Sequence, residues 1–440
     1  MRYVIFGSKN EKPKLDNIST RAGFTIVEVV IAVVIIAILA SITIIGYNMV
    51  TKQSVETSLK ADLQAVKSTL TMESRQTGSY PAPASASFMS GGQVFKASGD
   101  NILTYTVDGS QYCAAVRNPQ YPYTFYVSSQ TGQVKPGDCS EAGNVWTAQT
   151  TPTNAWSEIV YGNGVFLATA SGSVSAPETP GFGSTSTNGT SWSNAFSVGS
   201  GSAIDPSATY GGGKFVVKYE LGKIPSAASS NNGVTWQNNT PGATSQYQGN
   251  SVAYGAGVYV STVSSPPETY TRVFTSTDGL TWTNRTTTIP WYTWSAVTYS
   301  NGKFVAVGTN QVMVSTNGIS WTLSATPPSG TWSAVTYGNG LFVAVGRSGT
   351  NRVMTSPDGV TWTARTPAEV NDWSSVIYGN GKFVAVSKAG TNRVMTSPDG
   401  ITWTARAAAA PNPWASVTYG AGCFVAVAPT GTNRAMTSCW

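Results

Sequence analysis

The chain has 440 residues, of which only 10% are charged, and its formal net charge is +6. This length is too great for one ordinary domain. The sequence contains no histidine, which excludes metal sites with histidine ligands and every serine–histidine or cysteine–histidine nucleophile. The lysines and arginines form no cluster or stripe, so we expect no nucleic-acid partner. We also expect no metal and no cofactor.

The amino-terminal segment combines a basic leader with an apolar run. Residues 1–22 carry a net charge of +3, and the run from Phe24 to Tyr47 contains one charge, Glu28. The run is long enough to span a bilayer as a helix. An ionisable group in such a segment is costly, which indicates a functional role for Glu28. By the positive-inside rule, the basic leader lies in the cytoplasm.

The stretch GFTIVE, residues 23–28, resembles the leader of the type IV pilin and type II pseudopilin superfamily. The resemblance implies that a membrane-bound prepilin peptidase removes residues 1–23, cutting between Gly23 and Phe24, and methylates the new amino terminus. It also implies a single-pass membrane precursor and assembly with other pilin subunits through the amino-terminal helix. The new amino group needs a partner in a low dielectric, so we interpret Glu28 as an assembly residue.

A second apolar pattern follows the run. Apolar residues recur every three or four positions from Val55 through Leu59, Leu63 and Val66 to Leu70, which indicates an amphipathic helix. We therefore expect one long helix over residues 24–75, with its first half in the membrane. The order of elements after it resembles a pilin head, so an α+β module with a small antiparallel sheet is expected over residues 76–143.

A repeat of about 40 residues begins after the head. A tyrosine before a glycine-rich turn occurs seven times, at Tyr161, Tyr210, Tyr254, Tyr299, Tyr337, Tyr378 and Tyr419. One copy divides into four short alternating strands, WSAVTY, LFVAV, RVMTS and VTWTA, which is typical of a propeller blade. The last copy lacks a fourth strand, and residues 144–149 resemble that strand. We predict an all-β seven-bladed propeller over residues 144–440, closed by strand 144–149.

The four cysteines form two local pairs in the sequence, Cys113 with Cys139 and Cys423 with Cys439, although three connectivities are possible. An exported chain would form disulfides outside the cytoplasm. Cys423 and Cys439 fall on the second and third strands of the last copy. Antiparallel pairing would place these two residues opposite each other.

The turn SPDGVTW, residues 356–362, resembles the Asp-box of sialidase-like propellers, which is a structural turn. A sialidase-like hydrolase needs an arginine cluster and several carboxylates. Arg352, Arg393 and Arg434 recur at one repeat position, which favours a structural role, and carboxylates are scarce. We therefore predict that the propeller is not an enzyme and keep a surface-tethered glycan hydrolase as an alternative.

Aromatic residues suggest two kinds of surface. A tryptophan opens the first strand of five copies, either for packing between blades or for lectin-like stacking: Trp156, Trp294, Trp332, Trp373 and Trp414. The early copies also have long links between strands two and three, which share a face with the links between blades. Binding usually occurs on such loops, so Tyr270, Trp291 and Tyr292 are candidate ligand anchors.

Together these features predict a minor or tip subunit of a type IV pilus-like filament, which displays a propeller for adhesion to a glycan or protein. The precursor would lie in the cytoplasmic membrane, and the mature form at the cell surface or in an extracellular filament. One alternative is a pseudopilin of a type II secretion system that presents the propeller to cargo. Another is a membrane-anchored protein that never assembles.

Overall fold

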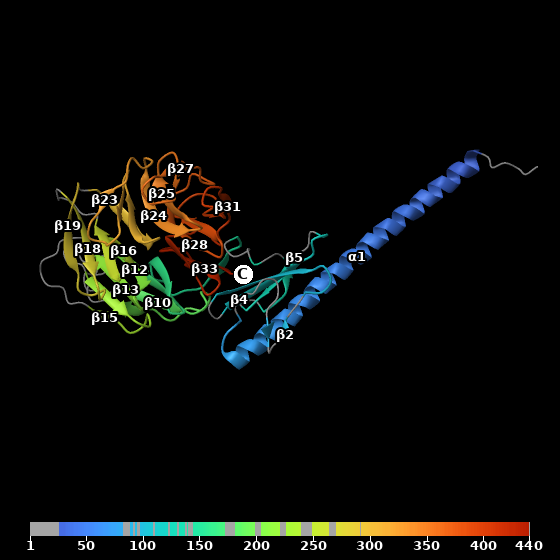
Figure 1. Cartoon of the computed structure of the whole chain (residues 1–440), viewed down its shortest axis with the longest axis horizontal. Coiled ribbons are helices and arrows are strands. Elements are labelled where there is room, and N and C mark those ends of the chain that lie inside the picture. Colours follow the sequence, from blue (N-terminus) through green and yellow to red (C-terminus); the bar gives the residue numbers. More distant parts are fainter. Residues whose placement is uncertain are drawn as a thin grey trace, which may run out of the picture. The chain divides into compact units, whose positions relative to one another are not determined.

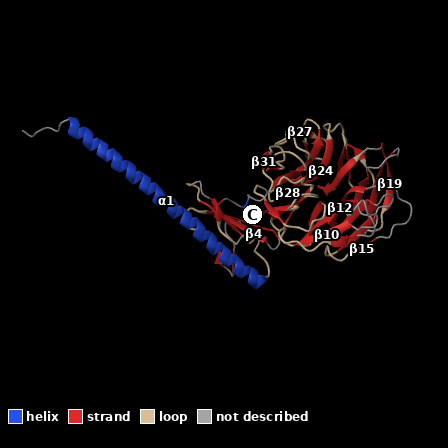
Figure 2. Ribbon diagram, turned by 180° about the vertical axis from the view of Figure 1, so that it is seen from behind, coloured by secondary structure: helices blue, strands red, loops and turns tan. Residues whose placement is uncertain are grey.

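The structure is a computed structural model of the chain (Figure 1). The residues that it describes are 26–81, 89–90, 93–94, 97–108, 111–121, 124–129, 132–136, 139, 144–171, 181–198, 204–220, 226–238, 249–263, 270–290 and 292–439. They form one long helix and otherwise strands and loops (Figure 2).

Helix α1 (Ile26–Thr77) contains 52 residues and is followed by Gly78, whose positive φ of 79° favours glycine. The chain divides into two compact units, Met1–Ser58 and Leu59–Trp440, so the helix begins in the first and ends in the second. The expected range of 24–75 agrees closely with these bounds, and residues 24 and 25 lie outside the described residues.

The second half of α1 belongs to the head. The predicted apolar stripe is fully buried at Leu59, Leu63, Val66 and Leu70. The head contains an antiparallel sheet in chain order and a short hairpin. Their strands are β3 (Ile102–Asp108), β4 (Gln111–Arg117), β5 (Thr124–Ser128) and β6 (Lys135–Pro136), with β1 (Met89–Ser90) and β2 (Gln93–Val94) in the hairpin.

The described residues from Thr147 to Cys439 form seven sheets of four antiparallel strands, numbered here sheets 1 to 7 in chain order. Sheets 1 to 3 are β8 (Trp156–Gly162), β9 (Val165–Ala170), β10 (Gly181–Ser186) and β11 (Phe196–Val198); β12 (Ile204–Gly211), β13 (Lys214–Glu220), β14 (Ser226–Ser230) and β15 (Gln237–Asn238); and β16 (Gly249–Gly255), β17 (Val258–Val263), β18 (Tyr270–Ser276) and β19 (Thr283–Pro290).

Sheets 4 to 6 follow the same plan. They are β20 (Trp294–Ser300), β21 (Lys303–Gly308), β22 (Val312–Ser315) and β23 (Thr322–Leu323); β24 (Thr331–Gly338), β25 (Leu341–Ser348), β26 (Val353–Ser356) and β27 (Thr363–Arg365); and β28 (Trp373–Gly379), β29 (Lys382–Ser387), β30 (Val394–Ser397) and β31 (Thr404–Arg406).

Sheet 7 joins the two ends of this region. It contains β32 (Ser416–Gly420), β33 (Cys423–Val427), β34 (Ala435–Cys439) and β7 (Thr147–Gln149). Strand β7 pairs with β34, where Ala148 lies opposite Met436. Gln149 Nε2 also donates a 2.9 Å hydrogen bond to Thr437 Oγ1. The first and last strands of the repeat region thus complete one sheet.

The first strands of the sheets form a closed inner ring, because each lies beside the next and β32 lies beside β8. The repeated tyrosine and the glycine after it make this contact possible. A Cβ at Gly420 would lie only 2.1 Å from the Cγ of Tyr161 in sheet 1. The same close approach joins Gly162 to Tyr210, Gly211 to Tyr254, Gly255 to Tyr299, Gly338 to Tyr378 and Gly379 to Tyr419.

The fourth strand begins later than the sequence predicts. In sheet 5 the expected strand started at Val360, whereas β27 begins at Thr363. The turn explains the difference, because Asp358 Oδ1 accepts the N–H groups of Val360 and Thr361, each at 2.8 Å. These backbone donors lower the pKa of Asp358 to about 2. Donors engaged in the turn cannot extend the sheet.

Both cysteine pairs form disulfides. Cys113 bonds to Cys139 in the head, and Cys423 bonds to Cys439 in sheet 7. Cys423 and Cys439 are direct partners in the antiparallel register of β33 and β34. This register is the arrangement that the repeat pattern predicts.

Candidate functional site

The sequence places its first candidate site at the start of α1. Gly23 and Phe24 lie outside the described residues, and Glu28 lies within the helix with an undescribed side chain. Nearby, Val30, Ile31, Val33 and Val34 each expose between 50% and 59% of their surface. This part of α1 therefore presents apolar surface that the first unit does not cover. Within the described part of the chain, no helix offers a stretch both long and apolar enough to cross a membrane.

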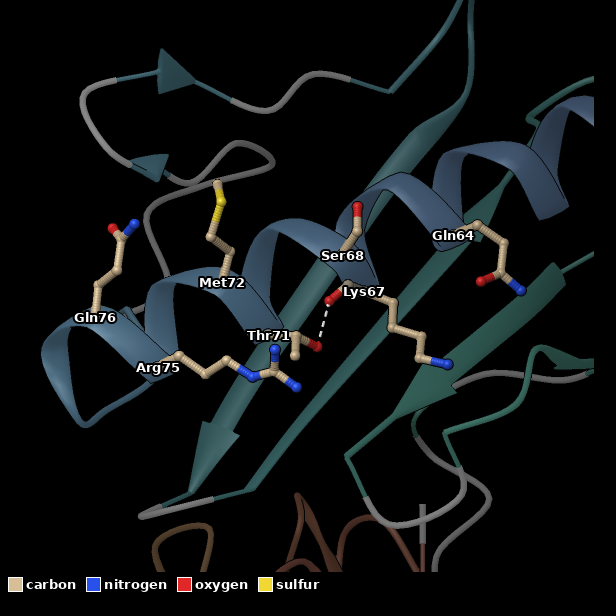
Figure 3. A pocket seen from close by; sticks show the side chains of 7 residues that line it. All are labelled: Gln64, Lys67, Ser68, Thr71, Met72, Arg75 and Gln76. Atoms are coloured by element: carbon tan, nitrogen blue, oxygen red, sulfur yellow. Dashed lines mark hydrogen bonds between the residues drawn. The ribbon is translucent and has the colours of Figure 1, made fainter.

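The second half of α1 has an accessible polar face. A groove of about 690 Å³ runs along it, and the residues that line it project from the helix at intervals of one, three or four (Figure 3). Lys67 Nζ donates to the carbonyl of Gly132 at 2.7 Å, and Thr71 Oγ1 donates to the carbonyl of Lys67 at 2.8 Å. The lining residues are Gln64, Lys67, Ser68, Thr71, Met72, Arg75 and Gln76.

The inner ring contains an unusual carboxyl group at the junction of sheets 7 and 1. Ser416 Oγ donates a 2.7 Å hydrogen bond to Glu158 Oε1 and accepts the N–H of Ile159 at 3.3 Å. Burial raises the pKa of Glu158 to about 7, against the opposing effect of the bond from Ser416. The side chain keeps some accessible surface, but surrounding protein dominates its electrostatics. Glu158 can therefore change its charge near neutral pH.

A fully buried lysine lies between sheets 2 and 3. Lys218 Nζ donates a 2.9 Å hydrogen bond to Ser261 Oγ, and it lies 4.6 Å and 4.9 Å from the ring centroids of Phe274 and Trp282. Burial lowers the pKa of Lys218 to about 7. Although an amine beside a hydroxyl resembles a base and nucleophile, both side chains are completely buried. A substrate therefore has no access to this pair.

The repeated arginines serve the fold. Arg352 Nη1 donates to the carbonyl of Asn371 at 2.7 Å, and Arg393 Nη1 donates to that of Pro411 at 2.6 Å. Arg434 Nη1 donates to the carbonyl of Asn154 at 2.8 Å. Each arginine thus fastens the segment that leads into the following sheet, from sheet 7 back to sheet 1 in the last case.

The repeated tryptophans also serve the fold. All five are fully buried, so the interpretation of these residues as a lectin-like stacking surface is wrong. Four of them donate from Nε1 to a carbonyl four residues earlier, for example from Trp373 to Glu369 at 3.0 Å. The fifth, Trp294, donates to Thr271 Oγ1 at 3.2 Å. The indoles therefore combine apolar burial with a satisfied polar group.

The structure describes the three predicted ligand anchors to different extents. Trp291 lies outside the described residues, and Tyr270 lies in β18 with an undescribed side chain. Tyr292 is half-buried and packs edge-on against Trp294, with ring centroids 6.1 Å apart. Its ring thus belongs to the core of sheet 4. Most of the long links also lie outside the described residues, at 172–180, 221–225 and 264–269.

The sequence analysis missed Glu158 and Lys218. Both break the repeat: Lys218 occupies the position of Val307, Val345, Val386 and Val427, as the strand registers show. Glu158 occupies a position that is serine or alanine in the other sheets. A search for polar substitutions at buried repeat positions would have found them. Among the described residues, no group of three or more acidic or cysteine side chains could hold a metal ion.

Comparison with protein families identifies one motif. Residues 18–44 match the model of the prokaryotic N-terminal methylation motif. This range includes the predicted cleavage site and Glu28. No curated protein is significantly similar to the chain in sequence.

Several solved structures resemble the propeller. A catalytically inactive variant of virginiamycin B lyase from Staphylococcus aureus with quinupristin has a TM-score of 0.54 and 12% identity, covering 67% of this chain and 98% of its own. A streptogramin B lyase has a TM-score of 0.51 and 11% identity over 67% and 96%. YCF48 bound to D1 peptide has a TM-score of 0.51 and 12% identity over 68% and 96%. At this identity the similarity shows a β-propeller fold alone.

These similarities correct the prediction that the propeller is not an enzyme. Two of the structures of similar fold are lyases, so scarce carboxylates and structural arginines do not exclude catalysis by this fold. The prediction rested on one hydrolase class and its arginine cluster, and other chemistry on a propeller does not need that cluster.

Proposed function

We propose that this chain, a β-propeller with a prokaryotic N-terminal methylation motif at residues 18–44, is a minor or tip subunit of a type IV pilus-like filament. The motif implies processing by a prepilin peptidase and pilin assembly in general. The proposed cut lies between Gly23 and Phe24. In this proposal residues 24–75 carry the single membrane pass of the precursor and the assembly contacts of the mature subunit.

The motif is the observation that carries the proposal. It overlaps the first part of a 52-residue helix, whose described apolar side chains near the start are half-exposed. Covering this surface lowers the free energy of the system, by lipid before assembly and by neighbouring helices afterwards. Glu28 would then partner the methylated amino terminus of Phe24, because both charges lie in a low dielectric.

The size of the propeller supports a minor or tip position. Residues 144–440, the proposed seven-bladed propeller closed by strand 144–149, are far larger than the head at residues 76–143. Many adjacent copies would crowd a filament shaft. At the tip, the same rigid body could display a binding surface at the cell exterior.

The test is the amino terminus of the protein recovered from sheared surface filaments, measured by mass spectrometry. We expect a chain that begins at N-methylated Phe24. An intact Met1, found only in the membrane fraction, would overturn the proposal. A methylated terminus found only in the cell envelope, with no filament fraction, would point to a secretion pseudopilin instead.

Glu28→Ala tests the assembly role. We expect at least a tenfold loss of the subunit from the sheared fraction, because the amino terminus would be left as an uncompensated charge. Glu73→Ala is the matched control, since it removes a carboxylate from the second half of the same helix. Equal incorporation of the two variants would contradict the role of Glu28.

A further inference from the structure

Side chains bridge neighbouring sheets at one end of the propeller. The bridges start in the turn between the first and second strands, or at the first residue of the second strand, and end on a carbonyl in the third-to-fourth-strand turn of the next sheet. Lys214 Nζ donates to Asp278 O at 3.4 Å, and Lys303 Nζ donates to Asp358 O at 2.8 Å. Asparagines make the same connection from Asn163 to Asn231 and from Asn339 to Pro398.

Sheet 3 lacks the side chains for such a bridge. It carries Ala256 where sheets 1, 4, 5 and 6 have asparagine, and Val258 where sheets 2, 4 and 6 have lysine. Neither side chain can donate a hydrogen bond. A groove of about 410 Å³ opens at this junction between sheets 3 and 4. It is lined by Ala256, Gly257, Val258, Thr275, Ser276, Thr277, Thr281, Thr283, Arg285, Asn317 and Ile319.

The chemistry of the groove combines one cation with many hydroxyl groups. Arg285 Nε donates to Thr275 Oγ1 at 3.1 Å, which orients the guanidinium. Among the described residues, no hydrogen bond uses its two terminal nitrogens, and no lining residue is a carboxylate. The neighbouring Asp278 is engaged elsewhere, since its Oδ1 accepts the N–H groups of Leu280 and Thr281 at 2.8 Å and 2.7 Å.

We propose that this groove binds an acidic sugar unit of a polysaccharide. The guanidinium of Arg285 would pair with a carboxylate or sulfate, for which its planar donor geometry is suited. The hydroxyl groups and Asn317 would bind the sugar hydroxyls, and Val258 and Ile319 would contact its apolar face. A volume of about 410 Å³ falls within the usual range for small-ligand sites.

Two observations favour a sugar over nucleic acid. A nucleic-acid site usually neutralises several phosphates, and this groove has one cation. Its lining also has no aromatic side chain for base stacking. The groove lies at the opposite end of the strands from the links between strands two and three, because antiparallel strands alternate in direction. The site is therefore separate from the predicted face of Tyr270 and goes beyond the proposed filament role.

The test measures binding of the full-length purified protein to polygalacturonate, dextran sulfate and neutral dextran by biolayer interferometry. We expect binding to one or both acidic polymers and none to dextran. Preference for polygalacturonate would assign a carboxylate, and preference for dextran sulfate would assign a sulfate.

Three variants localise the site. Arg285→Gln and the double variant Ala256→Asn/Val258→Lys, which restores the bridging residues of sheets 4 and 6, should each weaken binding about tenfold or more. Arg365→Gln is the matched control, since Arg365 makes the same contact with Thr355 in sheet 5. It should bind as the unchanged protein does. Thermal unfolding checks that each variant folds.

Three results would overturn the proposal. The first is equal weakening by Arg285→Gln and Arg365→Gln, which would show general charge attraction. The second is no binding to either acidic polymer, and the third is equal binding to dextran. None of these results affects filament incorporation, which depends on residues 18–44 and is measured separately.

Discussion

Sheets 5 and 6 are nearly identical in sequence, whereas sheets 1 to 3 depart from the repeat at buried and bridging positions. Val345 and Val386 occupy in the regular sheets the position of Lys218 in sheet 2. Asn339 and Asn380 occupy the position of Ala256 in sheet 3. The same backbone therefore carries two kinds of residue, those that repeat and those that do not.

The comparison separates the requirements of the fold from local properties. Repeating residues make repeating contacts, such as the buried tryptophans and the arginines that fasten one sheet to the next. Each departure changes a single junction between two sheets, as the buried amine of Lys218, the carboxyl group of Glu158 and the open groove beside Arg285 do at three different junctions. Function in a repeat protein is best sought where the repeat fails.

The largest expected effect comes from breaking a repeating position. Trp373→Ala should lower the free energy of unfolding by about 3–5 kcal/mol, since it empties a fully buried site and removes the bond to Glu369. Denaturant unfolding measures this change. Val370→Ala, at a side chain that is 65% exposed, is the control and should stay within about 0.5 kcal/mol. Similar values for both would show that the tryptophan does not anchor the sheet.

Lys218→Met tests the buried departure in sheet 2. With the pKa lowered to about 7, the unfolded state binds more protons between pH 7 and pH 10, so stability should rise with pH there. The variant should lose this slope. Its free energy of unfolding at pH 6 should rise by about 2 kcal/mol, because no ammonium is then buried. The gain is no larger because the rings of Phe274 and Trp282 offset part of the cost of burying the ammonium.

Unfolding between pH 6 and pH 9.5 measures the slope. Lys388→Met, at an exposed position, is the control and should keep the slope of the unchanged protein. An unaltered slope in Lys218→Met would contradict the role of the buried amine.

Glu158→Gln should have the smallest effect on stability. The pH dependence that it removes is opposite in sign to the one caused by Lys218. The raised pKa means that the folded state keeps a proton up to about pH 7, so the stabilising contribution falls as pH rises from about 4.5 to 7. Glu158→Gln should reduce the change in the free energy of unfolding between pH 5 and pH 8 by roughly 1 kcal/mol. The change is this small because the side chain keeps some accessible surface, where solvent screens part of the effect of burial.

Unfolding midpoints at pH 5 and pH 8 measure this change. Glu369 is the matched control, because the hydrogen bond from Asn392 lowers its pKa. Glu369→Gln should therefore leave the slope above pH 5 unchanged. A flattening in Glu369→Gln and none in Glu158→Gln would reverse the assignment.

Much of the fold follows from local pattern in the sequence. The stripe through Leu59 and Leu70 predicted the buried face of α1, because helical periodicity places such residues on one side. Alternation and turn residues predicted the four strands of each copy, and the missing strand of the last copy predicted a partner for β34. The predicted start of the fourth strand was wrong, because side-chain hydrogen bonds within the turn compete with the sheet.

By itself, the sequence determined the methylation motif, the long helix and the repeat, because each depends on residue type and spacing along the chain. Only the tertiary structure decided what contacts individual side chains make. Lys218 meets Ser261 of the next sheet, Glu158 meets Ser416 across the closing junction, and the groove beside Arg285 opens where two small residues fail to reach sheet 4. These contacts join residues far apart in the sequence, so no local pattern contains them.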